Sequence, residues 1–301
     1  MTDRRREVRI GVACALIVLT IWTAFILVSR AGMRGTLTPF DLAALRFGFA
    51  ATVLFPVFLR RGIGALNFGQ FAAIGSIAGI GYALFAYSGF VFAPASHGAV
   101  LLPGPQPLLS ALLAWWLLDE RIAGRRMLGL ALIVAGVALV GLQSLSEPAA
   151  GSWRGDLFFL GGAALWSLYG MLARKWHVHP LDATVAGAVF TSAAYLPVYF
   201  AFLPKNIAAT PIAEIVFQGV YQGLFAVVIA MLAYTQVVRT FGPLRTAMVT
   251  AVVPASAAVL SVPILGEPLL PLTLAGAAVT TAGMFVGVSG GRAAVATPRK
   301  E

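Results

Sequence analysis

Long apolar runs alternate with short polar segments along the whole chain. Ten runs can be counted, each about as long as the ~20 residues that an α-helix needs to cross a bilayer. Backbone polar groups cannot stay unpaired in lipid, so these runs predict helices and not open strands. The fold class expected is therefore an all-α membrane protein with ten transmembrane helices. The runs are 10–29, 41–59, 70–92, 97–118, 127–143, 157–173, 181–203, 213–238, 246–265 and 270–289.

The longest connector between runs is SLSEPAAGSW, residues 144–153, and it divides the ten runs into two groups of five. We predict five units in chain order. They are a cytoplasmic N-terminus (1–9), a first five-helix repeat (10–143), an outer linker (144–156), a second, inverted five-helix repeat (157–289) and a cytoplasmic tail (290–301).

Composition excludes a soluble domain. The 301 residues are 59% hydrophobic and 11% charged, whereas soluble domains are about 25% charged. The basic, apolar N-terminus could mimic a signal peptide, but its apolar run is long and lacks a small-residue cleavage site, so we expect a retained anchor.

The net charge of +10 fits membrane topology better than nucleic-acid binding, and no nucleic-acid partner is expected. With the N-terminus inside, sixteen Lys and Arg fall on the cytoplasmic side. Only four fall outside, namely Arg30, Arg34, Arg154 and Lys205. This bias predicts a multi-pass protein of the inner (plasma) membrane with both termini in the cytoplasm.

The second half repeats the spacing of the first. Four residues recur 147 positions later: Pro107, Glu120, Gly129 and Gly136 reappear as Pro254, Glu267, Gly276 and Gly283. Other helices repeat at slightly different offsets, because loops absorb insertions. Trp22 matches Trp166 at 144, and Asp41 matches Asp182 at 141.

Five helices per copy is an odd number, so the second copy enters the membrane upside down. Inverted repeats are typical of alternating-access transporters, whose substrate site lies near the midplane between the copies. Pro107 and Pro254 then break helices that face the pathway. Glu120 and Glu267 mark where those helices end, at opposite faces of the membrane.

These repeated motifs, with PFDLAALRF opening the second helix, resemble the EamA-type drug/metabolite transporter superfamily over residues 8–290. The resemblance implies a ten-helix exporter of amino acids or other metabolites, with the YddG-like amino-acid exporters as the nearest type. One departure is Arg46, whose counterpart in the second half is Gly187, so the symmetry of any site is imperfect.

Aromatic residues at matching positions are the first candidates for substrate binding. Trp22 and Trp166 lie midway through their helices, although tryptophan prefers the membrane interface. Tyr87 and Tyr234 match by the repeat, and Tyr82 and Tyr169 are weaker candidates. The alternative for each is a packed ring with an internal hydrogen bond.

Amide groups are the second set of candidates. Gln106 lies among prolines that free backbone carbonyls, which only a wet cavity tolerates. Gln218, Tyr221 and Gln222 share one face of the eighth helix. Hydrogen bonding between helices is the alternative to substrate contact.

Arg46 is the one basic residue inside a predicted span. It could be a counter-charge for a substrate carboxylate, but we expect it to snorkel to the outer end of its helix. It is grouped with Pro107, Glu120, Pro254 and Glu267 as structural or gating. The expected cavity is aromatic and amide-lined, without a fixed charge at its centre.

The repeat favours a carrier over a membrane enzyme, which needs clustered titratable groups, or a channel, which needs charged or carbonyl rings. No carboxylate is predicted to lie at the membrane midplane, and His97 is expected at the membrane interface. We therefore expect facilitated movement of a small-molecule substrate by a monomer in the lipid bilayer, without cofactor or metal. A proton-coupled exporter of drugs or other metabolites is the alternative.

Overall fold

The structure is a computed structural model that describes residues 2–118, 124–146 and 151–289. Glu120 lies outside the described residues. Across the described ranges the chain is helical and forms no strand, which confirms the all-α prediction.

The first half contains five membrane-spanning segments. Their elements are α1 (Thr2–Arg34), α2 (Pro39–Arg61), a continuous span of α3 (Phe68–Ile74), η1 (Gly75–Gly81) and α4 (Tyr82–Phe92), a broken span of α5 (Ala95–Leu101) and α6 (Gln106–Leu118), and α7 (Arg125–Ser146).

The second half repeats this order. Its elements are α8 (Ser152–Lys175), a span of α9 (Pro180–Val185), η3 (Ala186–Phe190) and α10 (Thr191–Phe202), the short η4 (Ile207–Ala209), a span that begins with α11 (Ile212–Gly219) and η5 (Val220–Ile229), then α12 (Ala230–Thr250), α13 (Val253–Leu265) and α14 (Pro271–Ser289).

Nine helices in the described residues are long and apolar enough to cross a membrane, and one of them runs from Ile212 to Thr250. That helix turns at Gly242, whose φ of 80° and ψ of 165° only glycine adopts without strain. The eight residues after the turn, together with α13, make a further broken span. The described chain therefore has the ten predicted spans.

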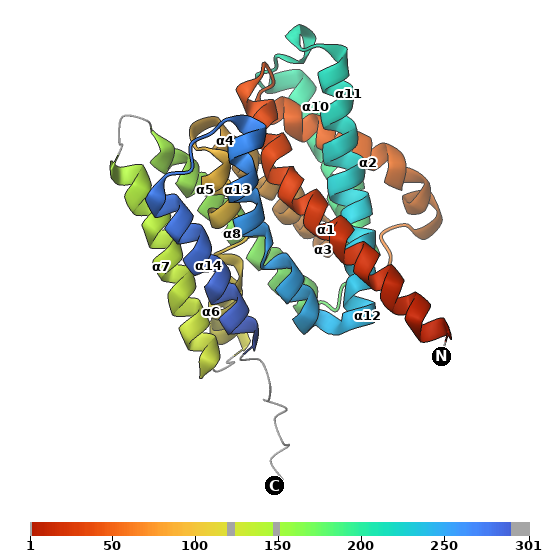
Figure 1. Ribbon diagram of the computed structural model, residues 1–301. Coiled ribbons are helices and arrows are strands. Elements are labelled where there is room, and N and C mark those ends of the chain that lie inside the picture. The colour runs from red at the N-terminus through yellow and green to blue at the C-terminus, as the bar shows by residue number, and fades with distance from the viewer. Residues whose placement is uncertain (1, 119–123, 147–150, 290–301) are drawn as a thin grey trace.

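The start of α1 and the last described turn of α14 lie on the same side of the helix bundle (Figure 1). An even number of spans requires this. At one edge of the bundle α7 and α14 lie side by side (Figure 1). They are the fifth helices of the two halves.

Repeated glycines allow α7 and α14 to pack backbone against backbone. A Cβ added at Gly136 would lie 2.7 Å from the carbonyl oxygen of Gly276, and one added at Gly283 would lie 2.8 Å from that of Gly129. Such distances leave no room for a side chain. The pairing of 136 with 276 and of 129 with 283 is antiparallel, as an inverted repeat requires.

Two repeated acids also join the halves. Asp41, at the start of α2, accepts a hydrogen bond from the hydroxyl of Tyr199 in α10 at 2.5 Å. Asp182, in α9, accepts one from Nε of Arg61 at the end of α2, at 2.8 Å. In each half, the carboxylate near the start of the second span therefore bonds to the end of the second span of the other half.

The glycine contact predicts a sharp difference between two neighbouring positions of α7. Gly136→Ala should lower the unfolding free energy by about 1–3 kcal/mol, because the new methyl collides with α14. Gly141→Ala is the matched control, since its Cβ meets nothing within 4 Å. Thermal unfolding of both variants in detergent measures the difference; equal melting temperatures would contradict the close packing.

Candidate functional site

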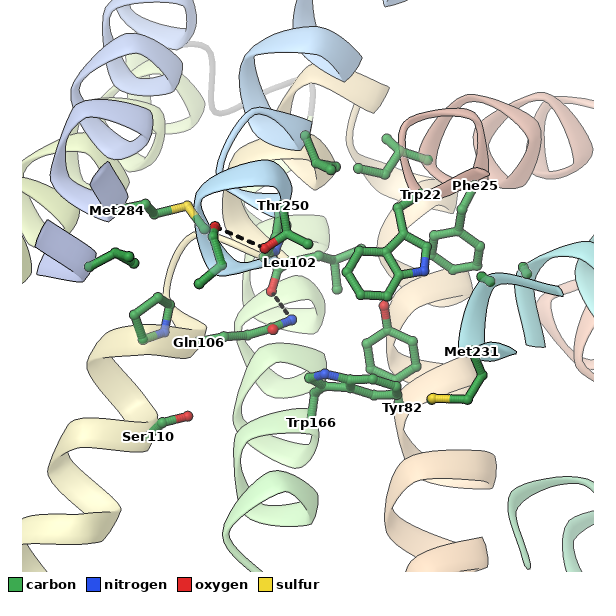
Figure 2. Close-up of a pocket in the computed structure, with 18 of the residues that line it drawn as sticks. Trp22, Phe25, Tyr82, Leu102, Gln106, Ser110, Trp166, Met231, Thr250 and Met284 are labelled. Carbon is green, nitrogen blue, oxygen red and sulfur yellow. Dashed lines mark hydrogen bonds between the residues drawn. The ribbon is translucent and has the colours of Figure 1, made fainter. Parts of the chain in front are cut away.

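A cavity of about 340 Å³ lies in the middle of the bundle, between the two halves. Its walls come from α1, α2, α4, the broken span α5–α6, α8, the η5–α12 region, α13 and α14. Figure 2 shows these side chains converging on the cavity. The residues that line it are Trp22, Phe25, Ile26, Arg46, Tyr82, Leu102, Pro103, Gln106, Pro107, Ser110, Trp166, Ala226, Ala230, Met231, Ala247, Thr250, Val253, Met284 and Val288.

The two broken spans meet at this cavity. Pro103 and Gln106 flank the break between α5 and α6, and Thr250 and Val253 stand 147 positions later at the break before α13. All four line the cavity. The prolines predicted to break helices along the pathway, Pro107 and Pro254, therefore follow directly after the breaks.

A side chain donates to a backbone carbonyl beside each break; at the second break the same carbonyl, that of Ala247, also accepts from the backbone N–H of Ala251. The Gln106 amide donates to the carbonyl of Leu102 at 2.9 Å, and the Thr250 hydroxyl donates to that of Ala247 at 3.1 Å (Figure 2). Prolines at 103 and 105 cannot donate backbone hydrogen bonds, so Gln106 supplies one from its side chain. Its first role is thus to complete the broken helix.

The two repeated tryptophans face the cavity from opposite halves, each packed on tyrosine. Trp22 stacks on Tyr234 with ring centroids 5.4 Å apart. Trp166 contacts Tyr82 at 4.8 Å and Tyr169 at 5.2 Å. Figure 2 shows Trp22, Tyr82 and Trp166 one after another along one wall. The ring packing is not symmetric, although the tryptophan positions are.

Arg46 brings a positive charge to the cavity wall. Its side chain is only 9% exposed, and its Nη1 is buried without a hydrogen-bond partner in the described chain. The guanidinium carbon lies 5.6 Å from the centroid of the Phe25 ring. The expectation that Arg46 snorkels is wrong, because burial holds it inside, and so is the expectation of a cavity without fixed charge.

A buried polar network closes the cavity away from the side of the N-terminus. Gln222 accepts from the Tyr87 hydroxyl at 3.0 Å and donates to the hydroxyl of Ser29 at 3.1 Å. Gln218 donates to the carbonyl of Val28 at 3.2 Å. These contacts join α1, α4, α11 and η5. Three of the predicted substrate-binding residues therefore form hydrogen bonds between helices: Tyr87, Gln218 and Gln222.

An ion pair lies beyond this network. Glu267 accepts from Nε of Arg30 at 2.6 Å and from the backbone N–H of Ala95 at 2.7 Å, and Arg30 also donates to the carbonyl of Phe90. Glu267 therefore fastens the turn after α13 to α1 and to the start of α5. On the opposite side, lining residues continue along α14 to Val288. The cavity extends toward the side that carries the N-terminus.

His97 is buried, 3% exposed, and not interfacial as expected. Its Nδ1 lies 2.9 Å from Asp156, its Nε2 lies 3.2 Å from the hydroxyl of Thr273, and Ser144 also donates to Asp156. The cluster ties α5 to α7, α8 and α14. The sequence could not predict this burial, because the hydrogen-bond partners of His97 come from helices distant along the chain.

Of the nine residues predicted to bind substrate, three line the cavity: Trp22, Gln106 and Trp166. The other six do not line it: Tyr87, Tyr169, Gln218, Tyr221, Gln222 and Tyr234. Among the five structural or gating candidates, Arg46 and Pro107 line it, while Pro254 is buried in α13 and Glu267 forms the ion pair.

Phe25 and Ile26 were missed by the sequence reasoning. They follow Trp22 by three and four residues, which places them on the same helical face. That helical spacing from Trp22 could have predicted that both residues line the cavity. Tyr82, one of the weaker candidates, also lines the cavity. Met231 and Met284 give no comparable signal, because an apolar run contains many such residues.

Two inverted five-helix halves, each with a broken helix that borders a shared cavity, define a multi-pass membrane transporter. This chain belongs to the EamA-like transporter family, which matches it over residues 9–142 and 153–288.

Relatives agree with this class. The chain is 26% identical over 262 residues to "Uncharacterized transporter YyaM" of Bacillus subtilis (strain 168), covering 83% of this chain and 85% of the relative. It is 25% identical over 294 residues to "Probable amino-acid metabolite efflux pump" of Escherichia coli (strain K12), covering 92% and 94%. A solved crystal structure, 21% identical, shares the fold with a TM-score of 0.63 over 97% of this chain and 100% of that one.

The ion pair predicts that Glu267→Gln loosens the closed side. Glutamine cannot pair with the charge of Arg30, so α1, α5 and the turn after α13 should separate more readily. In a Cys14→Ser background, a cysteine replacing the fully buried Ser29 should react severalfold faster with a thiol reagent. Arg34→Gln, which removes only an exposed bond to the carbonyl of Leu265, is the control. Unchanged labelling would show that the ion pair does not hold this side closed.

Proposed function

We propose that this protein exports amino acids, aromatic or neutral, or related small metabolites across the inner membrane by alternating access. The observation that carries the proposal is the central cavity at which the broken helix of each half meets its counterpart. A volume of about 340 Å³ suits a small molecule. The name of the relative from Escherichia coli, "Probable amino-acid metabolite efflux pump", supports the substrate class.

The proposed orientation places both termini in the cytoplasm. The sixteen-to-four distribution of basic residues supports it. In that orientation the cavity extends toward the cytoplasm, while the Arg30–Glu267 pair and the Gln222 network lie on the outer side. This conformation is then the one that receives a solute for export. One chain encloses the whole cavity, so we propose a monomer that needs no cofactor.

Facilitated diffusion is the proposed energetics. Proton antiport requires a protonatable group in the solute path, and no carboxylate of the described residues lines the cavity. A proton-coupled exporter is the second candidate, because the buried His97–Asp156 pair holds two protonatable groups together outside the cavity.

Reporter fusions test the orientation. A fusion at residue 150 should report the outer side, and a fusion after residue 290 should report the cytoplasm, because five spans separate the two points. The measurement is the activity of a reporter that works on one side of the membrane only. The same side for both fusions would contradict ten spans, and the reverse pattern would invert the orientation.

Proteoliposomes test the transport function and its energy source. Vesicles loaded with candidate amino acids and metabolites should release at least one solute down its own gradient without a pH gradient. An imposed pH gradient should leave the solute distribution at equilibrium unchanged. Release that occurs only with a pH gradient would refute facilitated diffusion and favour the proton-coupled alternative.

Trp166→Ala supplies the site variant for the same assay. It should reduce the rate of release several-fold, because it removes an aromatic wall of the cavity, while thermal stability in detergent is retained. Trp116→Ala is the matched control, since Trp116 is 73% exposed and outside the cavity. Loss of folded protein in Trp166→Ala would assign that residue to packing instead.

A further inference from the structure

We propose that Arg46 is the carboxylate-binding residue of the cavity, and that the substrate is a monocarboxylate whose body is apolar or aromatic and whose amine, if present, carries no charge. The proposal deepens the transport function above and rests on it. Within that function it selects the related small metabolites over free amino acids: acids that lack an ammonium group or have it acylated.

The first argument is the unpaired charge. A buried cation without a counter-ion costs free energy unless a partner arrives. Arg46 takes part in none of the ion pairs of the described residues, where Arg30, Arg61 and His97 each face a carboxylate. Asp41, five residues away in α2, is occupied by Tyr199 and by the backbone of Asn206. The negative charge that completes Arg46 is therefore missing from the described chain.

The second argument is geometric. The Phe25 ring, with its centroid 5.6 Å from the guanidinium carbon, is attracted to the cation and restricts its position. A ring cannot replace the oxygen acceptors that a guanidinium edge requires, and Nη1 remains without an acceptor. A planar guanidinium held in this way matches a carboxylate, which offers two oxygens side by side. The Tyr87 phenol is a neutral hydrogen-bond partner for another part of the guanidinium, and the Tyr82 phenol lies within electrostatic range of it, but neither supplies a negative charge.

The third argument is the absence of a site for an ammonium group. No carboxylate among the described residues lines the cavity. The carbonyls of Leu102 and Ala247 at the two breaks already accept hydrogen bonds from Gln106 and Thr250. Tyrosine rings pack on Trp22 and Trp166, so part of each indole is already covered. A zwitterion would gain at its carboxylate and lose at its desolvated ammonium.

Four probes that share a benzyl group separate the charge types. They are N-acetylphenylalanine (anion), phenylalanine (zwitterion), phenylalaninamide (cation) and N-acetylphenylalaninamide (neutral). Their affinities for the purified full-length protein are measured by calorimetry and by tryptophan fluorescence, which phenyl probes do not obscure. The anion should bind roughly tenfold or more tightly than the other three, as a charged hydrogen-bonded pair implies.

Variants assign the preference to one residue. Arg46→Gln should abolish the advantage of the anion while leaving the neutral probe unchanged, which also shows that the cavity is folded. Arg46→Lys should retain part of it. Arg154→Gln is the matched control: Arg154 also lies over an aromatic ring, Trp153 at 5.4 Å, but is exposed at the start of α8. It should retain the full preference.

Each failure has its own meaning. Equal affinity for anion and zwitterion, or an anion preference that survives Arg46→Gln, overturns the proposal and leaves the transport function standing. Proteoliposomes that carry other solutes while no probe binds overturn the substrate class alone. If no solute is carried and none binds, the proposed function fails together with it.

Discussion

A backbone carbonyl released inside a membrane must find a donor, and this constraint decides where a helix of this protein can be interrupted. Two membrane spans of the described chain are interrupted, and both interruptions border the cavity. At the first, the Gln106 amide supplies the hydrogen bond that the backbone no longer gives to the carbonyl of Leu102. At the second, the carbonyl of Ala247 accepts from the backbone N–H of Ala251 and also from the Thr250 hydroxyl. The cavity and the breaks therefore depend on one another: the breaks need polar surroundings, and the cavity is built from the residues beside them.

The two halves are pseudo-symmetric at the helix contacts, where packing requires the same small residues. They differ at the cavity, where the side chains that line it are not the same. Gly129 and Gly136 each contact the repeat of the other, Gly283 and Gly276, across the α7–α14 interface, so both copies must stay small. Trp22 and Trp166 keep their positions but have different ring partners. Arg46 faces the cavity from one half only, because its counterpart is Gly187. A symmetric framework thus holds an asymmetric site.

The sequence predicted the framework well because its signals are repeated and local. Apolar length gave the ten spans. The offsets of 147, 144 and 141 related residues that lie at the α7–α14 contact, in the cavity walls and in the contacts of α2 with α9 and α10. The cavity itself was predicted less well. Polarity alone does not tell whether a buried amide faces a solute or a neighbouring helix, so Gln106 and Gln222 looked equivalent, yet only Gln106 lines the cavity.

Arg46 shows why charge was harder to place than shape. A long basic side chain one or two turns from a helix end can reach the interface, and nothing in the sequence of α2 prevents it. What prevents it is tertiary: Phe25 from α1 lies against the guanidinium, and the phenols of α4 face it. Those three helices meet at Arg46, which is therefore a residue of the assembled cavity and not of its own helix. Several helices hold this charge inside the protein, and no counter-ion of the described chain balances it. The net charge of the cavity therefore depends on whether an anion is bound.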